Sequence, residues 1–325
     1  MDKTTTNAQQ NTAGNNEKQA LKQTTLGLSA QTWGILLLLI TPALLSSNMI
    51  VARAVAETIP SVTLAFTRWL VAIVILLPFI GMKMWQIRSL LIAEWKQLLL
   101  LGCLGMGVCG AFPYIGAKTT TATNIGLIYA LSPIFIILFA RFWYAEQLSK
   151  RQFLGVFFAL SGVLVIVAKG QWQILTSLAF SAGDLWILAA SASWGFYSLW
   201  QGHLKTKLSL YIRFSAMAFG GVLALAPFML IELYTQEPIV WSNDYIQTFV
   251  ITILFLSLVS SILAYSAYAK IQKILGTSKA SLVMYAIPLY NAALAWLLLG
   301  EELQGFHIMG ALLILPGLFL AVSKR

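Results

Sequence analysis

Charged residues are scarce in this chain. They make up 10% of its 325 residues, whereas hydrophobic residues make up 59% and the mean hydropathy is +0.80. A soluble domain needs about 25% charged residues to cover its surface. This deficit excludes an ordinary soluble protein and indicates one that resides in a lipid bilayer.

Cysteine and histidine are also rare, with two of each. Cys103 and Cys109 lie six residues apart in one apolar run, which places them on different faces of a helix. His203 and His307 are far from them in the sequence. Because a disulfide or a metal site needs closer geometry or additional ligands, we expect packing cysteines, no metal and no other cofactor.

Two further absences narrow the function. Although the net charge is +10, Lys and Arg stand singly or in pairs without a basic face, so nucleic acid is not expected as a partner. No nucleophile–base pair or carboxylate cluster accompanies the apolar runs, so we expect no catalytic residues and no enzyme. Asp and Glu are absent from the middle of the runs, so proton coupling, exchange and facilitated export all stay open.

Long apolar runs are what the chain has in abundance. A helix needs about 20 apolar residues to cross a bilayer. On this measure we predict ten transmembrane helices: Trp33–Ala52, Ser61–Gly81, Leu98–Gly116, Asn124–Tyr144, Phe153–Ala168, Leu185–Gln201, Ile212–Leu233, Ile246–Tyr268, Ser281–Gly300 and Phe306–Val322. The polar segment 1–30 predicts a disordered tail, followed by five-helix units at 31–170 and 171–325.

The two halves of the chain repeat each other. Five residues recur at a constant offset of 155: Pro133, Glu146, Leu148, Gly155 and Gly162 match Pro288, Glu301, Leu303, Gly310 and Gly317. More weakly, Pro78-Phe79 recurs as Pro227-Phe228 at an offset of 149. Because five is odd, the second unit must cross the membrane in the opposite sense. This predicts two inverted five-helix repeats, an arrangement that secondary transporters use.

The positive residues predict the orientation. With the N-terminus inside, 17 of the 21 Lys and Arg residues fall on the inner side and three on the outer side. The remaining one, Arg68, lies within a predicted span. Since cytoplasmic loops carry an excess of Lys and Arg, we predict that both termini are cytoplasmic, in a bacterial inner membrane.

The repeated motif also resembles a known family. Small residues before a proline helix, a Glu at its end, and then Leu, Gly and Gly in the next helix are similar to the EamA-type half of the drug/metabolite transporter superfamily. The segment Phe66–Leu70 resembles that family's arginine segment, and Trp194-Gly195 resembles its tryptophan-glycine pair. The resemblance covers residues 34–322 and implies a ten-helix exporter of amino acids, metabolites or drugs.

The chain departs from the family pattern at two positions. Leu45-Ser46-Ser47-Asn48 stands where many relatives have Trp-Gly before the Asn, and Ala145 stands where Gly usually precedes the Glu. The shared motifs are mainly structural. They therefore imply the fold more strongly than the substrate.

An inverted repeat places its substrate site near the middle of the bilayer, between the two units. The candidate substrate-binding residues are the polar and aromatic residues near the middle of the spans: Asn48, Arg68, Tyr114, Tyr129, Trp194, Tyr197, Tyr265, Tyr268, Tyr285 and Asn291. Each aromatic residue could instead pack between helices with a satisfied hydroxyl. Arg68 could instead be a structural charge that extends to the outer interface. Trp69 and Trp241 fit interface anchors better.

These patterns together predict a secondary-active transporter that exports small metabolites, foremost amino acids with aromatic or hydrophobic side chains, by alternating access. The alternatives are a multidrug or cation efflux carrier of the same fold and, with less support, a membrane-embedded enzyme or a channel. The expected partners are a small-molecule substrate and the lipid bilayer, and the expected state is a monomer or weak dimer.

Overall fold

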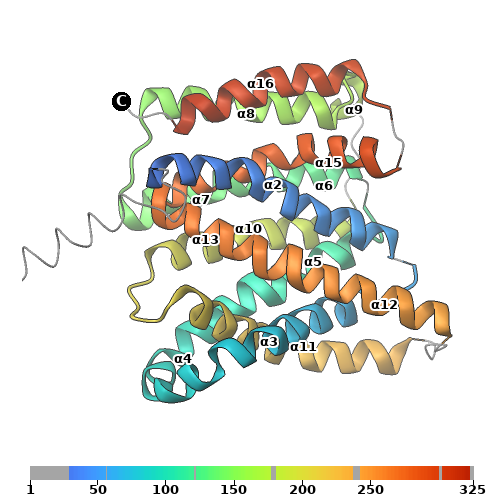
Figure 1. Ribbon diagram of the computed structural model, residues 1–325. Coiled ribbons are helices and arrows are strands. Elements are labelled where there is room, and N and C mark those ends of the chain that lie inside the picture. Colours follow the sequence, from blue (N-terminus) through green and yellow to red (C-terminus); the bar gives the residue numbers. More distant parts are fainter. Residues whose placement is uncertain are drawn as a thin grey trace, which may run out of the picture.

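The computed structural model describes residues 29–55, 57–120, 122–176, 181–236, 242–299 and 302–322. Within these ranges the secondary structure is helical and contains no strand (Figure 1). The predicted all-α class is therefore confirmed. Most of the predicted tail, Trp241 and Glu301 lie outside the described residues.

The first half of the chain forms helices that lie side by side along one common direction (Figure 1). Their bounds are α2 (Ala30–Ala54), α3 (Ser61–Gln86), α4 (Arg88–Gly102), η1 (Cys103–Val108), α5 (Cys109–Gly116), α6 (Ala122–Tyr129), α7 (Ser132–Tyr144) and α8 (Lys150–Val167). The predicted span Asn124–Tyr144 is thus two helices. Pro133 has no amide hydrogen with which to continue the helix, and a turn separates α6 from α7 just before it.

The second half follows the same order after a short helix. Its elements are α9 (Trp172–Thr176), α10 (Ala182–His203), α11 (Leu210–Thr235), α12 (Asn243–Phe255), η2 (Leu256–Leu263), α13 (Ala264–Leu275), α14 (Thr277–Ala280), α15 (Val283–Leu299) and α16 (Gly305–Val322). Eight helical segments in the described part are long and apolar enough to cross a membrane. Helices α10 and α15 are not among them; α15 has 17 residues, and α10 carries several Ser residues and Asp184.

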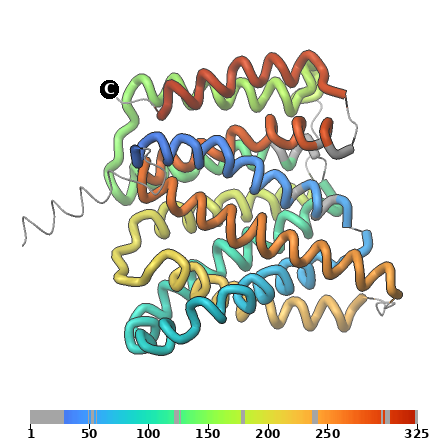
Figure 2. The backbone as a smooth tube through the Cα atoms, viewed as in Figure 1, coloured from blue at the N-terminus to red at the C-terminus, as the bar shows by residue number. Residues whose placement is uncertain are grey.

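The two halves interlock through their first helices. Helix α2 packs on α13 and α15 of the second half, and α10 packs on α5 and α7 of the first half. Figure 2 shows this exchange most clearly for α2, the blue helix, which lies beside orange and red segments. Each half therefore completes the other, and the core between them contains residues from both.

Glycines bring α8 and α16 into close contact. A Cβ atom on Gly155 would lie 2.6 Å from the carbonyl oxygen of Gly317, and one on Gly162 would lie 2.7 Å from that of Gly310. Only residues without a side chain allow two helix backbones to approach this closely. Because the partners occur in reverse order along the chain, the two helices are antiparallel.

Both halves contain a π-helical segment in their third long helix. Segment η1 (CLGMGV) packs on α10 and α11, and η2 (LSLVSSIL) packs on α2 and α3. A π-helical turn interrupts the regular i to i−4 hydrogen bonding, and such turns are frequent at functional sites. The two segments therefore place irregular backbone where the halves meet.

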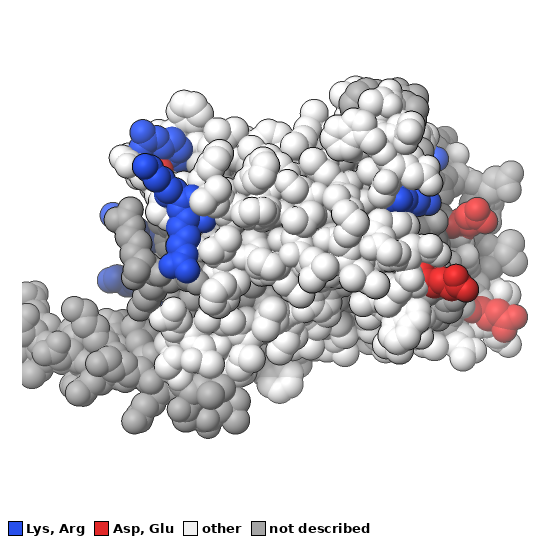
Figure 3. Space-filling model, turned by 90° about the horizontal axis from the view of Figure 1, so that it is seen from above, with Lys and Arg blue, Asp and Glu red and all other residues white. Residues whose placement is uncertain are grey.

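Charge is separated along the helix direction. On the face shown in Figure 3, most of the visible Lys and Arg side chains lie at one end, Asp and Glu side chains lie mainly at the other end beside a few basic ones, and uncharged surface lies between. We call the first the basic end, which carries Arg88, Arg141 and Lys150, and the second the acidic end, which carries Glu57 and Asp244. The uncharged middle fits a bilayer.

Candidate functional site

The centre of the molecule holds a buried arginine. The Arg68 side chain comes from α3 and is 2% exposed. Its Nη1 donates hydrogen bonds to Asn48 Oδ1 at 2.6 Å and to the Tyr114 hydroxyl at 2.8 Å. The Tyr114 hydroxyl in turn donates to Asn48 Oδ1 at 2.6 Å. Three sequence-predicted site residues from α2, α3 and α5 therefore form one closed network.

Among the described residues, this arginine has no acidic partner. No Asp or Glu oxygen of the described part of the chain lies within 4.0 Å of the Arg68 guanidinium. The Arg68 Nε atom is buried and makes no hydrogen bond. The guanidinium lies instead over the rings of Trp69, at 4.8 Å, and Tyr114, at 5.5 Å. A buried charge held only by neutral groups carries a large desolvation cost. The alternative in which Arg68 extends to the interface is wrong, because its hydrogen bonds hold it inside the protein.

An aromatic cluster lies next to Arg68. Tyr265 of α13 is at its middle: its ring centroid is 5.0 Å from that of Trp69, 5.6 Å from that of Trp194 and 6.2 Å from those of Tyr197 and Phe214. Trp194 also contacts Tyr268 at 5.2 Å and Tyr197 at 5.5 Å. We call these six residues the aromatic cluster. It combines helices α3, α10, α11 and α13, and so both halves of the chain.

The π-helical segments anchor this cluster. The Tyr265 hydroxyl donates to the carbonyl oxygen of Gly105 in η1 at 3.1 Å. A Cβ atom on Gly105 would lie 2.5 Å from ring atoms of Tyr197, so this position accommodates only glycine. On the other side, Ser257 of η2 donates to the carbonyl oxygen of Arg68 at 2.8 Å. Both irregular segments therefore hold residues of the centre in place.

Three other predicted residues are placed differently. Tyr129, at the end of α6, is half-buried and close enough to Arg68, Tyr114 and Tyr265 to interact with them electrostatically. Tyr285 and Asn291 lie on α15, which packs on α2 and α8. The Tyr285 hydroxyl and Asn291 Oδ1 are buried and form no hydrogen bond. These two residues take no part in the ring contacts of the aromatic cluster.

Two members of the cluster are not found by the sequence criteria. Trp69 is fully buried, at 0% exposure, so its prediction as an interface anchor is wrong. Phe214, which is also buried, was not among the candidates. The position of Trp69 next to Arg68 in the sequence could have indicated its role, because the face of an aromatic ring can contact a neighbouring buried cation. Nothing in the local sequence distinguishes Phe214 from an ordinary packing residue.

A pocket lies between the aromatic cluster and the basic end. It has room for about one water molecule. It is lined by Tyr197, Gln201, Leu210, Arg213, Phe214, Met217, Tyr265, Ser266 and Ala269. These residues come from the end of α10, the beginning of α11 and the middle of α13. The aromatic cluster forms its inner wall, because Tyr197, Phe214 and Tyr265 belong to both.

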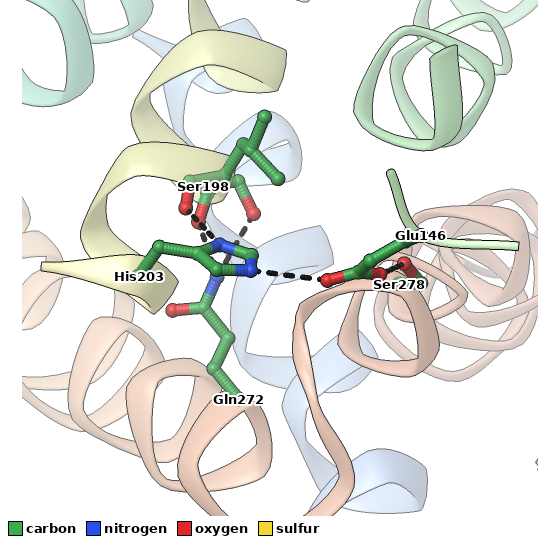
Figure 4. Close-up of polar contacts among 6 residues, drawn as sticks. Glu146, Ser198, His203, Gln272 and Ser278 are labelled. Carbon is green, nitrogen blue, oxygen red and sulfur yellow. Dashed lines mark hydrogen bonds and ion pairs between the residues drawn. The ribbon is translucent and has the colours of Figure 1, made fainter. Parts of the chain in front are cut away.

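Polar contacts join the two halves at the basic end (Figure 4). Glu146, which follows α7, pairs through Oε1 with His203 Nε2 at 3.0 Å and accepts from Ser278 Oγ through Oε2 at 2.5 Å. The imidazole of His203 stacks on Tyr144. Glu146 thus links α7 to α10 and α14, which fits its predicted structural role at the turn.

A carboxylate also joins the halves near the acidic end. Glu232 of α11 accepts hydrogen bonds from the backbone amides of Val62, at 3.1 Å, and Thr63, at 2.7 Å. Thr63 Oγ1 donates to the same carboxylate at 3.0 Å. These amides begin α3, where a helix has unpaired donors and a partial positive charge. Glu232 therefore ties the end of α11 to the start of the helix that carries Arg68.

Comparison with known proteins identifies the family. The model of the EamA-like transporter family matches residues 32–168 and again residues 181–323. The chain belongs to the EamA-like transporter family. The resemblance seen in the sequence is confirmed, and each family domain coincides with one half of the structure. The family indicates a multi-pass transporter, and a transporter of this kind acts on a small-molecule substrate across a lipid bilayer.

Relatives of this EamA-like transporter support the same class. The uncharacterized transporter YyaM of Bacillus subtilis (strain 168) is 29% identical over 266 residues, which are 81% of this chain and 84% of the relative. A protein of Escherichia coli (strain K12) named "Probable amino-acid metabolite efflux pump" is 24% identical over 230 residues, 67% and 75% of the two chains. A solved crystal structure with 20% identity shares the fold, with a TM-score of 0.66, covering 90% of this chain and 96% of its own.

Proposed function

We propose that this EamA-like transporter is a secondary-active exporter of small amphipathic metabolites, foremost α-amino acids with apolar or aromatic side chains. The observation that carries the proposal is the buried guanidinium of Arg68, which has aromatic rings and neutral hydrogen-bond partners but no carboxylate from the described part of the chain. An amino acid supplies the missing carboxylate. Its apolar side chain would contact the rings of Trp69, Trp194 and Tyr265, which lie on the adjoining side.

The same observation argues against cationic drugs. A buried positive charge that is not neutralised repels a cation that enters the same site, and like charges in contact cost several kcal/mol. The two relatives named as efflux pumps of amino-acid metabolites, from Escherichia coli and Salmonella typhimurium, are consistent with an anionic or zwitterionic substrate. We therefore place amino acids ahead of the multidrug or cation alternative.

Ten membrane-spanning helices in two inverted repeats, 31–170 and 171–325, make up the proposed architecture. It is supported by the antiparallel contact of α8 with α16, the reciprocal packing of α2 and α10, and the paired π-helical segments. The proposed orientation puts the basic end, and with it both termini, in the cytoplasm, because positive residues favour that side.

Alternating access supplies the mechanism. The rings of the aromatic cluster contact one another, so a substrate must separate them to reach Arg68. Contacts between the halves at both ends, Glu146 with His203 and Glu232 with Thr63, would open in turn as the two units rock. The glycine contact of α8 with α16 would stay closed and act as the axis, since backbone-to-backbone packing leaves no room for rearrangement.

Counterflow in proteoliposomes tests this function. Vesicles that contain the purified protein are loaded with unlabelled leucine, and the uptake of labelled leucine is followed against vesicles loaded with buffer. We expect saturable uptake that depends on the internal leucine. Uptake that rises linearly with concentration would indicate a channel instead, and no flux of leucine, phenylalanine or their metabolites would contradict the proposal.

A further inference from the structure

We propose that the pocket at the basic end is a separate entry site for an α-amino acid, in which Arg213 binds the carboxylate and Gln201 the ammonium group. This inference rests on the proposed function for its substrate class. The entry site differs from the central site in position and in residues, because the pocket and Arg68 lie on opposite sides of the aromatic cluster. Arg213 and Gln201 line it together with rings of the cluster.

A chain of hydrogen bonds fixes the direction of the Gln201 amide. Gln272 Nε2 donates to the backbone carbonyl of Ser198 at 2.7 Å, a contact visible in Figure 4. Because a carbonyl oxygen only accepts, Gln272 must turn its nitrogen to Ser198 and its oxygen to Gln201. Gln201 Nε2 then donates to this oxygen at 3.1 Å. The side-chain oxygen of Gln201, Oε1, therefore has no hydrogen-bond partner.

This remaining oxygen is suited to a cation. Gln201 is 2% exposed, and its Oε1 is buried without a hydrogen-bond partner. A buried acceptor that has lost water and gained no donor is costly, so most such atoms in proteins are paired. An ammonium group in the pocket would donate to Oε1 and remove that cost. Only one of the two Nε2 hydrogens is used in the bond to Gln272, but it is the buried and unpaired Oε1 that requires a donor.

Arg213 offers the complementary charge. Its Nε is buried without a hydrogen-bond partner, and no carboxylate of the described residues lies within 4.0 Å of its side chain. Glu94 is close enough to act on it electrostatically, but the Glu94 carboxylate already accepts from Thr206 Oγ1 at 2.6 Å. Ser266 also lines the pocket, and its buried hydroxyl is unpaired. One wall therefore holds donors for a carboxylate and another holds an acceptor for an ammonium group.

The position of the pocket favours an amino acid on its way to the centre. In the structure its own side chains nearly fill the pocket and leave room for about one water molecule. An amino acid would therefore enter only when α10, α11 and α13 move apart. Tyr265 lines the pocket, contacts Trp69 at 5.0 Å, and Trp69 in turn lies under the guanidinium of Arg68. Displacement of the Tyr265 and Trp69 rings would connect the two sites. A carboxylate could then pass from Arg213 to Arg68.

Binding and transport are measured on the full-length protein in lipid nanodiscs and proteoliposomes. The probes are leucine, leucinol, which lacks the carboxylate, and N-acetyl-leucine, which lacks the ammonium group. The variants are Arg213→Gln, Gln201→Met and, as a matched control, Arg141→Gln at an exposed position of α7. Arg213→Lys keeps the charge and serves as the second variant if Arg213→Gln does not fold. Each binding measurement is repeated with Arg68→Met, which removes the central guanidinium.

We expect Arg213→Gln to weaken leucine binding about tenfold to hundredfold, since one charge-assisted interaction with the carboxylate is lost, and to leave leucinol binding unchanged or stronger. Gln201→Met should weaken leucine binding and leave N-acetyl-leucine binding unchanged, and Arg141→Gln should change neither.

The entry site is refuted if Arg213→Gln binds leucine as tightly as the wild type does, or if it loses affinity for leucinol as much as for leucine. This holds even when counterflow proceeds. If these patterns appear without counterflow, the entry site stands and the transport function fails. If the wild type binds no leucine, the entry site fails.

Discussion

The contact of α8 with α16 and the centre around Arg68 show two ways in which the halves of this transporter meet. Between α8 and α16 the halves contribute equivalent residues: Gly155 faces Gly317, and Gly162 faces Gly310. At the centre the two halves contribute residues that are not equivalent. Met217 stands 149 residues after Arg68, at the position that the weaker repeat would match to it, and it is an apolar core residue.

The difference separates framework from chemistry. Equivalent residues recur where two backbones must approach each other, because both units need the same packing. Unmatched residues gather where a substrate would lie, because one asymmetric ligand has to be held by two similar units. Substitutions at the centre should therefore affect transport, and substitutions between α8 and α16 should affect folding.

Replacing Arg68 should have the largest effect on transport. Arg68→Met, which copies the residue of the other half, should lower kcat/KM for leucine at least about a hundredfold, because charge-assisted hydrogen bonds contribute about 1.5–3 kcal/mol each. The melting temperature should stay the same or rise, since an apolar side chain of similar size often replaces a buried charge without loss. Counterflow kinetics and thermal unfolding check both parts. A fall in stability with normal transport per folded molecule would assign Arg68 a structural role.

Adding one methyl group between α8 and α16 should act on stability. In Gly162→Ala the new Cβ atom would meet the carbonyl oxygen of Gly310 at 2.7 Å, so the helices must separate at a cost of about 1–3 kcal/mol. We expect a melting temperature several degrees lower and unchanged leucine affinity. Gly81→Ala on α3 is the control, because its Cβ would lie 3.7 Å from the nearest side chain. Equal melting temperatures for the two variants would show that the contact is not tight.

Removing an aromatic ring from the cluster should change affinity for the substrate. Trp194→Ala loses ring contacts with Tyr197, Tyr265 and Tyr268, each of about 0.5–1.5 kcal/mol beyond its buried area. We expect the KM for leucine and phenylalanine to rise about tenfold. Trp143→Ala, at a side chain that is 58% exposed, should leave KM unchanged. The same KM for both variants would show that the substrate does not contact the aromatic cluster.

The smallest effect is expected at the basic end. Glu146→Gln keeps the acceptor for Ser278 and removes the charge that pairs with His203. Because both side chains are partly exposed, the pair contributes about 0–1 kcal/mol, and transport rates should change less than about threefold. A rate assay at fixed leucine concentration measures this. A loss as large as that of Arg68→Met would place the substrate or a coupling step at this contact instead.

The sequence predicted much of the framework and part of the centre. The glycines and the turn at Glu146 could be found because they recur at a fixed spacing, and Asn48, Arg68 and Tyr114 because polar residues are unusual inside a bilayer. Trp69 and Phe214 could not, since an aromatic residue in an apolar helix looks the same whether it faces lipid, an interface or the core. The free oxygen of Gln201 was also hidden, because only the three-dimensional hydrogen-bond chain through Gln272 shows which end of the amide is unpaired.

The central claim is that Arg68 binds the carboxylate of the substrate. It is tested most directly by the ratio of leucine to leucinol counterflow in the wild type and in Arg68→Met. The two probes share a side chain and an ammonium group and differ only in the carboxylate. We predict a ratio well above one in the wild type and a ratio near one in Arg68→Met, with leucinol transport unchanged or raised because the positive charge that repels its ammonium group is gone. The same ratio in both proteins would contradict the account.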